Sequence, residues 1–134
     1  MRALLFVLIT ALVSCGDNNA GNSNSQQNEA NSLAAVEQVT ARESQRFIQW
    51  LDEEYAEEVD FSPLLKTRQG DKSAHGELDD VSEAALDTRL EWRRASVAEM
   101  RSSFDRGQLD KQGQLSWDLW EYTLIDAQRS KPFR

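Results

Sequence analysis

Cysteine and histidine are almost absent from this chain. Its 134 residues include one cysteine, Cys15, and one histidine, His75. A lone cysteine has no partner for an intramolecular disulfide or a redox pair, and the two residues together fall short of the ligand sets of structural zinc sites. The zinc-peptidase motif His-Glu-x-x-His needs two histidines, so it is excluded. We therefore predict no catalytic, metal-binding or cofactor-binding residue in this chain.

Basic residues are also scarce, above all at the start of the chain. Lysine and arginine total 15 against 23 aspartates and glutamates, a formal net charge of −8. Arg2 is the only basic residue before Arg42. Nucleic-acid binding depends on clustered lysine and arginine, so this balance argues against a nucleic-acid partner. The sequence also lacks a glycine-rich phosphate loop and the Gly-x-Ser-x-Gly elbow of hydrolases.

The amino terminus has the layout of a secretory signal. Arg2 gives a positive start, and residues 3–13 (ALLFVLITALV) form an apolar stretch. As a helix this stretch would rise about 16 Å, far short of the roughly 30 Å hydrocarbon core of a bilayer. It therefore predicts a signal peptide over residues 1–14 and not a membrane-spanning anchor.

Residues 12–15 (LVSC) resemble the lipobox of bacterial lipoproteins. The resemblance implies that the preceding peptide is cleaved, that Cys15 is the site of lipid attachment and that its new amino terminus is acylated. Two or more acyl chains hold a protein firmly on a membrane, so the expected location is the cell envelope, lipid-anchored and facing the periplasm. Gly16 favours the outer membrane over the inner one, although Asp17 leaves that choice open in other bacteria. The alternative is an ordinary signal peptide followed by an incidental cysteine.

Residues 15–35 are predicted to be the lipidated cysteine and a flexible linker. Residues 17–31 (DNNAGNSNSQQNEAN) contain no large apolar side chain. Such a segment cannot offset the entropy lost on ordering. As a coil it would span roughly 20–24 Å, enough to hold a folded part just off a bilayer.

Residues 36–134 show apolar side chains at helical spacing, which predicts an all-α domain of three or four helices. The spacing of residues 40–43 (TARE) is that of a capping box, so a helix is expected to begin there and to end near Val59. Ser62 before Pro63 predicts a second, short helix that stops at Gly70.

Two longer helices are expected after a loop. Residues 71–81 have the composition of a loop, and His75 is interpreted as a solvated residue within it. Ser82 is expected to begin a helix that Gly107 closes, with Trp92 lying off its main apolar stripe. The last helix is expected to begin near Asp110.

Acidic residues offer further candidates for acid–base chemistry. We interpret the carboxylates at 53, 54, 57 and 58 as a solvated helix face. Asp79 and Asp80 are interpreted as capping residues. Residues 105–114 (DRGQLDKQGQ) suggest a calcium loop, but non-ligand residues stand where oxygen ligands are needed, so we reject that interpretation.

The last predicted helix is apolar around most of its circumference. Its large apolar residues are Leu115, Trp117, Leu119, Trp120, Tyr122, Leu124 and Ile125. Such a helix needs cover on more than one side, which a missing carboxyl-terminal region or self-association would supply. Trp117, Trp120 and Tyr122 could alternatively line a ligand groove, but aromatic residues at helical spacing more often form a core or an interface.

Three segments of the predicted helices resemble one known family. These are residues 43–63 (ESQRFIQWLDEEYAEEVDFSP), 90–100 (LEWRRASVAEM) and 115–122 (LSWDLWEY). Together with the closing KPFR, they are similar to the amino-terminal region of the bacterial domain of unknown function 885 family. Members are longer, mostly helical, often secreted or lipidated proteins with a His-Glu-rich segment like that of zinc metallopeptidases. No residue of that segment is present, so zinc is implied only for a full-length relative.

The sequence thus predicts a membrane-anchored lipoprotein that is the amino-terminal helical part of a metallopeptidase-like protein, inactive as this chain. The alternative is a stand-alone small lipoprotein that acts as a binding or structural module through its aromatic last helix. A small enzyme that uses the glutamates at 53–58 is a third hypothesis.

Overall fold

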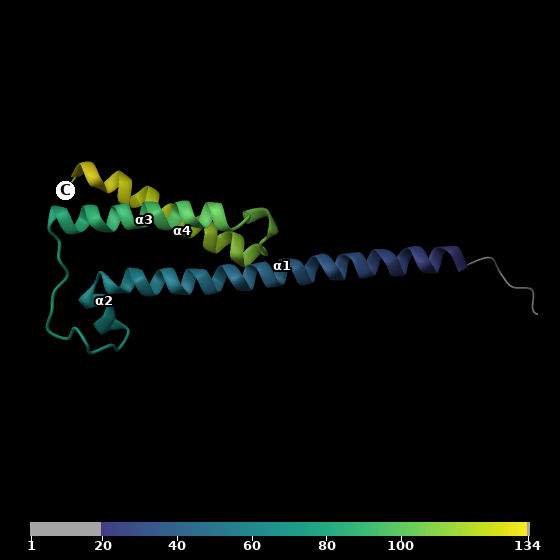
Figure 1. The fold of residues 1–134 in the computed structure, drawn as a ribbon, viewed down its shortest axis with the longest axis horizontal. Coiled ribbons are helices and arrows are strands. Elements are labelled where there is room, and N and C mark those ends of the chain that lie inside the picture. The colour runs from purple at the N-terminus through teal and green to yellow at the C-terminus, as the bar shows by residue number, and fades with distance from the viewer. Residues whose placement is uncertain (1–19, 134) are drawn as a thin grey trace, which may run out of the picture. The chain divides into compact units, whose positions relative to one another are not determined.

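A computed structural model describes the backbone of residues 20–133 and the side chains from residue 25 onward (Figure 1). The described part is all α, as predicted, and contains no strand. Its α-helices are α1 (Ala20–Asp60), α2 (Pro63–Arg68), α3 (Glu83–Ser103) and α4 (Lys111–Ser130). Two short 3-10 helices, η1 (Arg106–Gln108) and η2 (Lys131–Phe133), follow α3 and α4.

The described residues separate into two units, 20–34 and 35–133. The first consists only of the start of α1, and all of its described side chains are exposed. A helix that buries no apolar face gains no stability from packing. The flexibility expected of the linker over residues 15–35 therefore stays a prediction. The predicted signal peptide and Cys15 lie outside the described residues.

The capping box predicted at residues 40–43 is wrong. Thr40 lies inside α1, which is continuous from Ala20 to Asp60. The segment before Thr40 contains neither glycine nor proline from residue 22 onward, so nothing interrupts the helical backbone there. Glu43 instead accepts hydrogen bonds of 3.0 and 2.6 Å from Arg46, one turn further along. The predicted end near Val59 is confirmed by the end of α1 at Asp60.

The short helix α2 forms as its local signals predict. The Ser62 hydroxyl accepts a hydrogen bond of 3.0 Å from the Leu65 amide, and Pro63 takes the first helical position. Gly70 follows the helix with φ of 89°, a left-handed conformation that favours glycine. The loop predicted over residues 71–81 is confirmed.

The starts of α3 and α4 are also confirmed. The Ser82 hydroxyl accepts a hydrogen bond of 3.3 Å from the Ala85 amide, and the Asp110 carboxylate accepts one of 2.7 Å from the Gly113 amide. However, α3 ends at Ser103 and not at Gly107. The backbone turns extended at Phe104, whose ring is thereby buried among the helices, and this burial ends α3 before the glycine.

Three helices of the second unit surround one core. Residues 35–60 of α1 run antiparallel to α3, and α4 runs antiparallel to α3 in turn (Figure 1). The buried core residues are Phe47, Val97, Met100, Phe104, Leu109, Trp117 and Trp120. The rings of Phe47 and Phe104 meet edge to face, with centroids 5.2 Å apart, a favourable geometry for aromatic pairs.

Candidate functional site

Three tryptophan indoles donate hydrogen bonds at the contacts between the helices. The Nε1 atom of Trp50, on α1, lies 3.3 Å from a carboxylate oxygen of Glu99, on α3. In the opposite direction, the Nε1 atom of Trp92, on α3, donates a hydrogen bond of 3.1 Å to a carboxylate oxygen of Glu57, on α1. Trp92 is expected from the sequence to lie off the main apolar stripe of its helix. It is partly buried and packs against the core cluster.

The third indole, that of Trp120, donates to the buried hydroxyl of Ser96 at 2.9 Å. Ser96 also hydrogen-bonds the half-buried carboxyl of Glu54 from α1. Burial raises the pKa of Glu54 above its ordinary value, the Ser96 hydrogen bond opposes that rise, and the nearby carboxylates of Glu57 and Glu99 add to it. Among the described residues, Glu54 is the carboxyl whose pKa is raised by burial, which is the property expected of a general acid.

Arg93 forms the other charged contact between the helices. Its guanidinium pairs with Glu58 of α1 and donates a hydrogen bond of 2.6 Å to the Thr123 hydroxyl of α4. The same group lies 5.6 Å from the ring centroid of Trp92 and 5.5 Å from that of Trp120. One cation therefore joins all three helices of the core.

The interpretation of the glutamate run as a solvated face is wrong for two of its members. Glu54 and Glu58 are partly buried, and lie one helical turn apart on the side of α1 that contacts α3. Glu53 is exposed, as expected. The partners of Glu54 and Glu58 stand more than 30 residues further along the chain, so the local sequence carried no signal for them.

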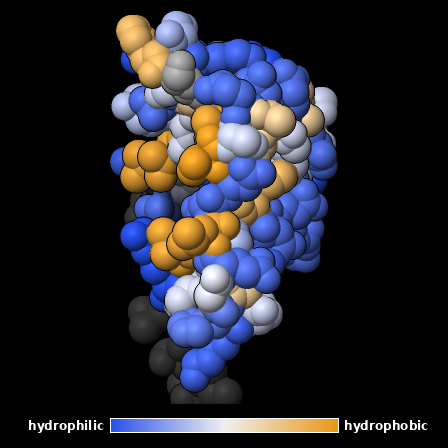
Figure 2. Space-filling view, turned by 90° about the vertical axis from the view of Figure 1, so that its left-hand side faces the viewer, coloured by the Kyte–Doolittle hydropathy of each residue, from blue (hydrophilic) through white to orange (hydrophobic). Residues whose placement is uncertain are grey.

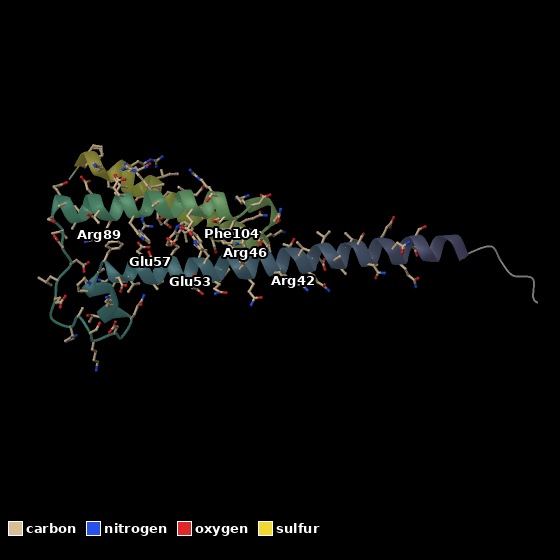
Figure 3. All side chains as sticks on the ribbon, viewed as in Figure 1. Arg42, Arg46, Glu53, Glu57, Arg89 and Phe104 are labelled. Atoms are coloured by element: carbon tan, nitrogen blue, oxygen red, sulfur yellow. The ribbon has the colours of Figure 1, made fainter. Side chains whose placement is uncertain are left out.

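The partly buried polar groups form contacts between the helices, and Glu58 and Arg93 also line a shallow pocket together with Leu86, Arg89, Leu90 and Ala127. A groove runs beside them, lined by Arg46, Gln49, Trp50, Glu53, Glu99, Ser103 and Phe104. Arg46 fills part of it, because its guanidinium lies 3.9 Å above the Phe104 ring and donates to the Ser103 carbonyl oxygen (Figure 3). Glu54 does not line this groove. The carboxyl with the raised pKa therefore has no opening toward a reactant there.

The loop candidates act as caps, as predicted. Asp79 accepts hydrogen bonds of 2.8 Å from the Ser62 hydroxyl and 3.1 Å from the Leu64 amide, which lower the pKa of the Asp79 carboxyl. Asp80 accepts a hydrogen bond of 2.8 Å from the Ser82 amide. His75 is exposed in the loop, which confirms its interpretation as a solvated residue.

Both acidic residues of the rejected calcium loop accept hydrogen bonds from backbone amides. Asp105 accepts a hydrogen bond of 2.8 Å from the Gly107 amide, and Asp110 caps α4. In the part of the chain with described positions, no three histidine, cysteine, aspartate or glutamate side chains are grouped to hold a metal ion. Cys15, the one functional residue named from the sequence, lies outside that part.

The aromatic residues of α4 divide between the core and the surface. Trp117 and Trp120 are buried, which confirms their interpretation as core residues, whereas Tyr122 is exposed. On the side of α4 away from the two tryptophans lies a set of large exposed apolar residues that we call the α4 stripe. Its members, with their exposed fractions, are Leu115 (63 %), Leu119 (62 %), Tyr122 (55 %) and Ile125 (42 %).

The α4 stripe follows from helical geometry. Positions 115, 119 and 122 are separated by four and three residues, so they share one face, and Ile125 borders it. Elsewhere, exposed apolar residues occur in separate clusters, as Figure 2 shows for the end of the second unit that carries α2 and the following loop. Leu64, Leu78, Val81 and Phe133 are other exposed examples.

None of the described helices combines the length and the hydropathy needed to cross a membrane. No family model, curated protein or solved structure gives a significant match to this chain.

Proposed function

We propose that this chain is a lipid-anchored helical module of the bacterial cell envelope that acts by binding protein and performs no catalysis itself. The anchor is the lipid on Cys15, and the binding surface is the α4 stripe. The observation that carries the binding role is the exposure of four large apolar residues on one face of α4. A contiguous apolar face of this kind on a small helical domain is typical of a surface that another protein covers.

The polar groups of the core support a non-catalytic role. The indoles of Trp50, Trp92 and Trp120 each have an acceptor, and Arg93 is held by Glu58 and Thr123. Groups engaged in this way fix the packing of helices and are not free to bind a reactant. The acidic composition, with a net charge of −8, also favours a protein partner over nucleic acid.

The resemblance to the domain of unknown function 885 family extends this proposal. In that case the chain is the amino-terminal helical part of a zinc metallopeptidase-like protein, inactive by itself, and the stripe is a surface for other helices of the longer protein. The alternative is a stand-alone small lipoprotein that binds a partner through α4. Sequencing the gene beyond the codon for Arg134 separates the two. An open frame with a His-Glu-x-x-His-like segment supports the first, and a stop codon supports the second.

The binding surface can be tested with an apolar fluorescent dye. The full chain at low concentration should enhance dye fluorescence, and a variant with Leu115→Ser and Leu119→Ser should lose most of the enhancement. Its free energy of unfolding should change little, because both side chains are exposed. Leu78→Ser, in the loop, is the matched control, since Leu78 is 86 % exposed. Equal dye binding by all variants would contradict a binding surface on α4.

A further inference from the structure

The face of α4 that carries the stripe has opposite charges toward its two ends. Lys111 lies at the start of the helix and Asp126 near its end, and both are exposed. Steps of four, four, three and four residues connect positions 111, 115, 119, 122 and 126, so the two charges share the face of the apolar residues. Among the described residues, neither charged group forms an ion pair or a side-chain hydrogen bond.

The other carboxylates beside the stripe already have partners. Asp118 pairs with Arg106 at 2.7 Å, and Glu121 pairs with Arg101 at 2.8 Å. Arg129, one turn beyond Asp126, completes the charges near this end of α4. Within the described part of the chain, the stripe is therefore preceded by the cation of Lys111 and followed directly by the anion of Asp126, with the cation of Arg129 one turn further out.

We propose that the occupant of the α4 stripe is a second copy of this chain, with the two α4 helices antiparallel. This inference rests on the proposed function, in which the stripe is the binding surface. A parallel pair would place Lys111 beside its own counterpart and Asp126 beside its own, so like charges would meet. An antiparallel pair places Lys111 of each copy near Asp126 of the other, and both contacts become attractive.

A two-fold arrangement also suits the shape of the surface. In an isologous dimer the same patch serves both copies, so one apolar stripe with opposite charges at its ends is self-complementary. Leu119 and Tyr122, between the two charges, would lie near the two-fold axis. Four apolar residues per copy are far fewer than the roughly 20–30 residues of a standard interface, so we expect a weak dimer. Lipid anchoring confines both copies to one surface and raises their effective concentration.

A zero-length cross-linker tests this pairing. A carbodiimide joins a lysine amine to a carboxylate in direct contact, and is applied to the full chain in bacterial membranes. Lys111 and Asp126 of one copy are 15 residues apart on α4, about 22 Å at 1.5 Å per residue, so they cannot be joined within one chain. The expected result is a cross-linked dimer whose digest contains a peptide joining residues 111 and 126. A digest without that peptide would overturn the proposal.

Charge reversal supplies the second test, read as the yield of dimer recovered when one of two differently tagged copies is purified from a mild detergent extract. Lys111→Glu in both copies, or Asp126→Lys in both, should lower the yield about tenfold. One copy with Lys111→Glu and the other with Asp126→Lys should restore it, because each end regains an opposite pair. Lys72→Glu, in an exposed loop, is the control and should have no effect. Failure of the mixed pair to recover would contradict the antiparallel arrangement.

The two proposals fail in different ways. If the 111–126 peptide is absent but the paired serine substitutions still abolish dye binding, the second copy is wrong and the α4 binding surface stands. If the serine substitutions also leave dye binding unchanged, both proposals are wrong.

Discussion

The indole Nε1 of Trp120 donates a buried hydrogen bond of 2.9 Å to the hydroxyl of Ser96. This contact joins α4 to α3, and the hydrogen bond between Ser96 and Glu54 adds α1. A single hydroxyl therefore contacts polar groups from two neighbouring helices, although the Oε2 atom of Glu54 has no hydrogen-bond partner among the described residues. The packing of the three helices depends on this hydroxyl, because a buried donor without an acceptor is costly.

Substitution of Ser96 should destabilise the fold. Ser96→Ala leaves the Trp120 indole without its acceptor, and we expect the free energy of unfolding to fall by about 1–3 kcal/mol. Urea denaturation followed by tryptophan fluorescence measures the change. Ser102→Ala is the control, since Ser102 is exposed and bonds only to the Glu99 carbonyl oxygen within its own helix. Equal effects of the two substitutions would count against a structural role for the Trp120–Ser96 contact.

Glu54 should make stability depend on pH. Its pKa is raised in the folded state, first by burial, so the folded protein binds this proton more tightly than the unfolded chain. Its contribution to stability is present below the ordinary glutamate value of 4.5 and is lost as the pH rises through the folded value. Glu54→Gln should therefore gain stability relative to the native chain at pH 7 and gain less at pH 4. The measurement is urea denaturation at both pH values.

The exposed neighbour of Glu54 supplies the control for that pH effect. Glu53→Gln removes the same charge type from the same helix at a position without burial. It should change stability little at either pH. If Glu53→Gln and Glu54→Gln gave the same pH dependence, burial of Glu54 would not be its cause.

Removal of the Arg93 cation should lower the free energy of unfolding more than removal of the neighbouring Arg94 cation. Arg93→Met leaves the partly buried Glu58 without its ion-pair partner and removes one of the two hydrogen bonds of Thr123, and we expect the free energy of unfolding to fall by about 2–4 kcal/mol. Arg94 pairs with Glu91 on the surface, so Arg94→Met should cost less than about 0.5 kcal/mol. Thermal unfolding of both variants followed by circular dichroism makes the comparison. A ranking in the opposite order would show that Arg93 does not join the helices.

The cap of α4 gives a local test of the fold. Asp110→Ala removes the acceptor of the Gly113 amide and should destabilise the protein by about 1 kcal/mol. Asp110→Asn keeps a side-chain oxygen and should cost less than half of that. Denaturant midpoints of both variants check the prediction. Equal losses for alanine and asparagine would mean that the charge, and not the capping oxygen, stabilises this end of the helix.

Local signals predicted most helix boundaries of the second unit. Ser62 with Pro63, Ser82 and Asp110 each begin a helix because their side chains bond amides only three residues away. The capping box at Thr40 failed because a cap also requires the backbone before it to leave the helix, and α1 is continuous there. A capping pattern by itself carries no information about the upstream chain.

The contacts between helices could not be predicted in the same way. The pairings of Arg93 with Glu58 and of Trp92 with Glu57 each join residues 35 positions apart. The spacing of positions 47, 51, 54 and 58 places Glu54 and Glu58, but not Glu53, on the face of α1 that carries Phe47. It does not say which residues of α3 they contact, because that depends on how the helices pack. The excess of apolar residues on α4 was visible in the sequence, because seven large apolar residues exceed one face of a helix. The structure adds which of them stay exposed.

The proposed location of the protein depends on lipid attachment at Cys15, which labelling with radioactive palmitate measures directly. The full chain and its Cys15→Ser variant are expressed in bacteria in the presence of the label, and each is purified and counted. We expect label in the native chain, recovery of that chain with the membrane fraction, and loss of both with Cys15→Ser. Label that persists in the Cys15→Ser variant would contradict the anchor and, with it, the location from which the binding function is argued.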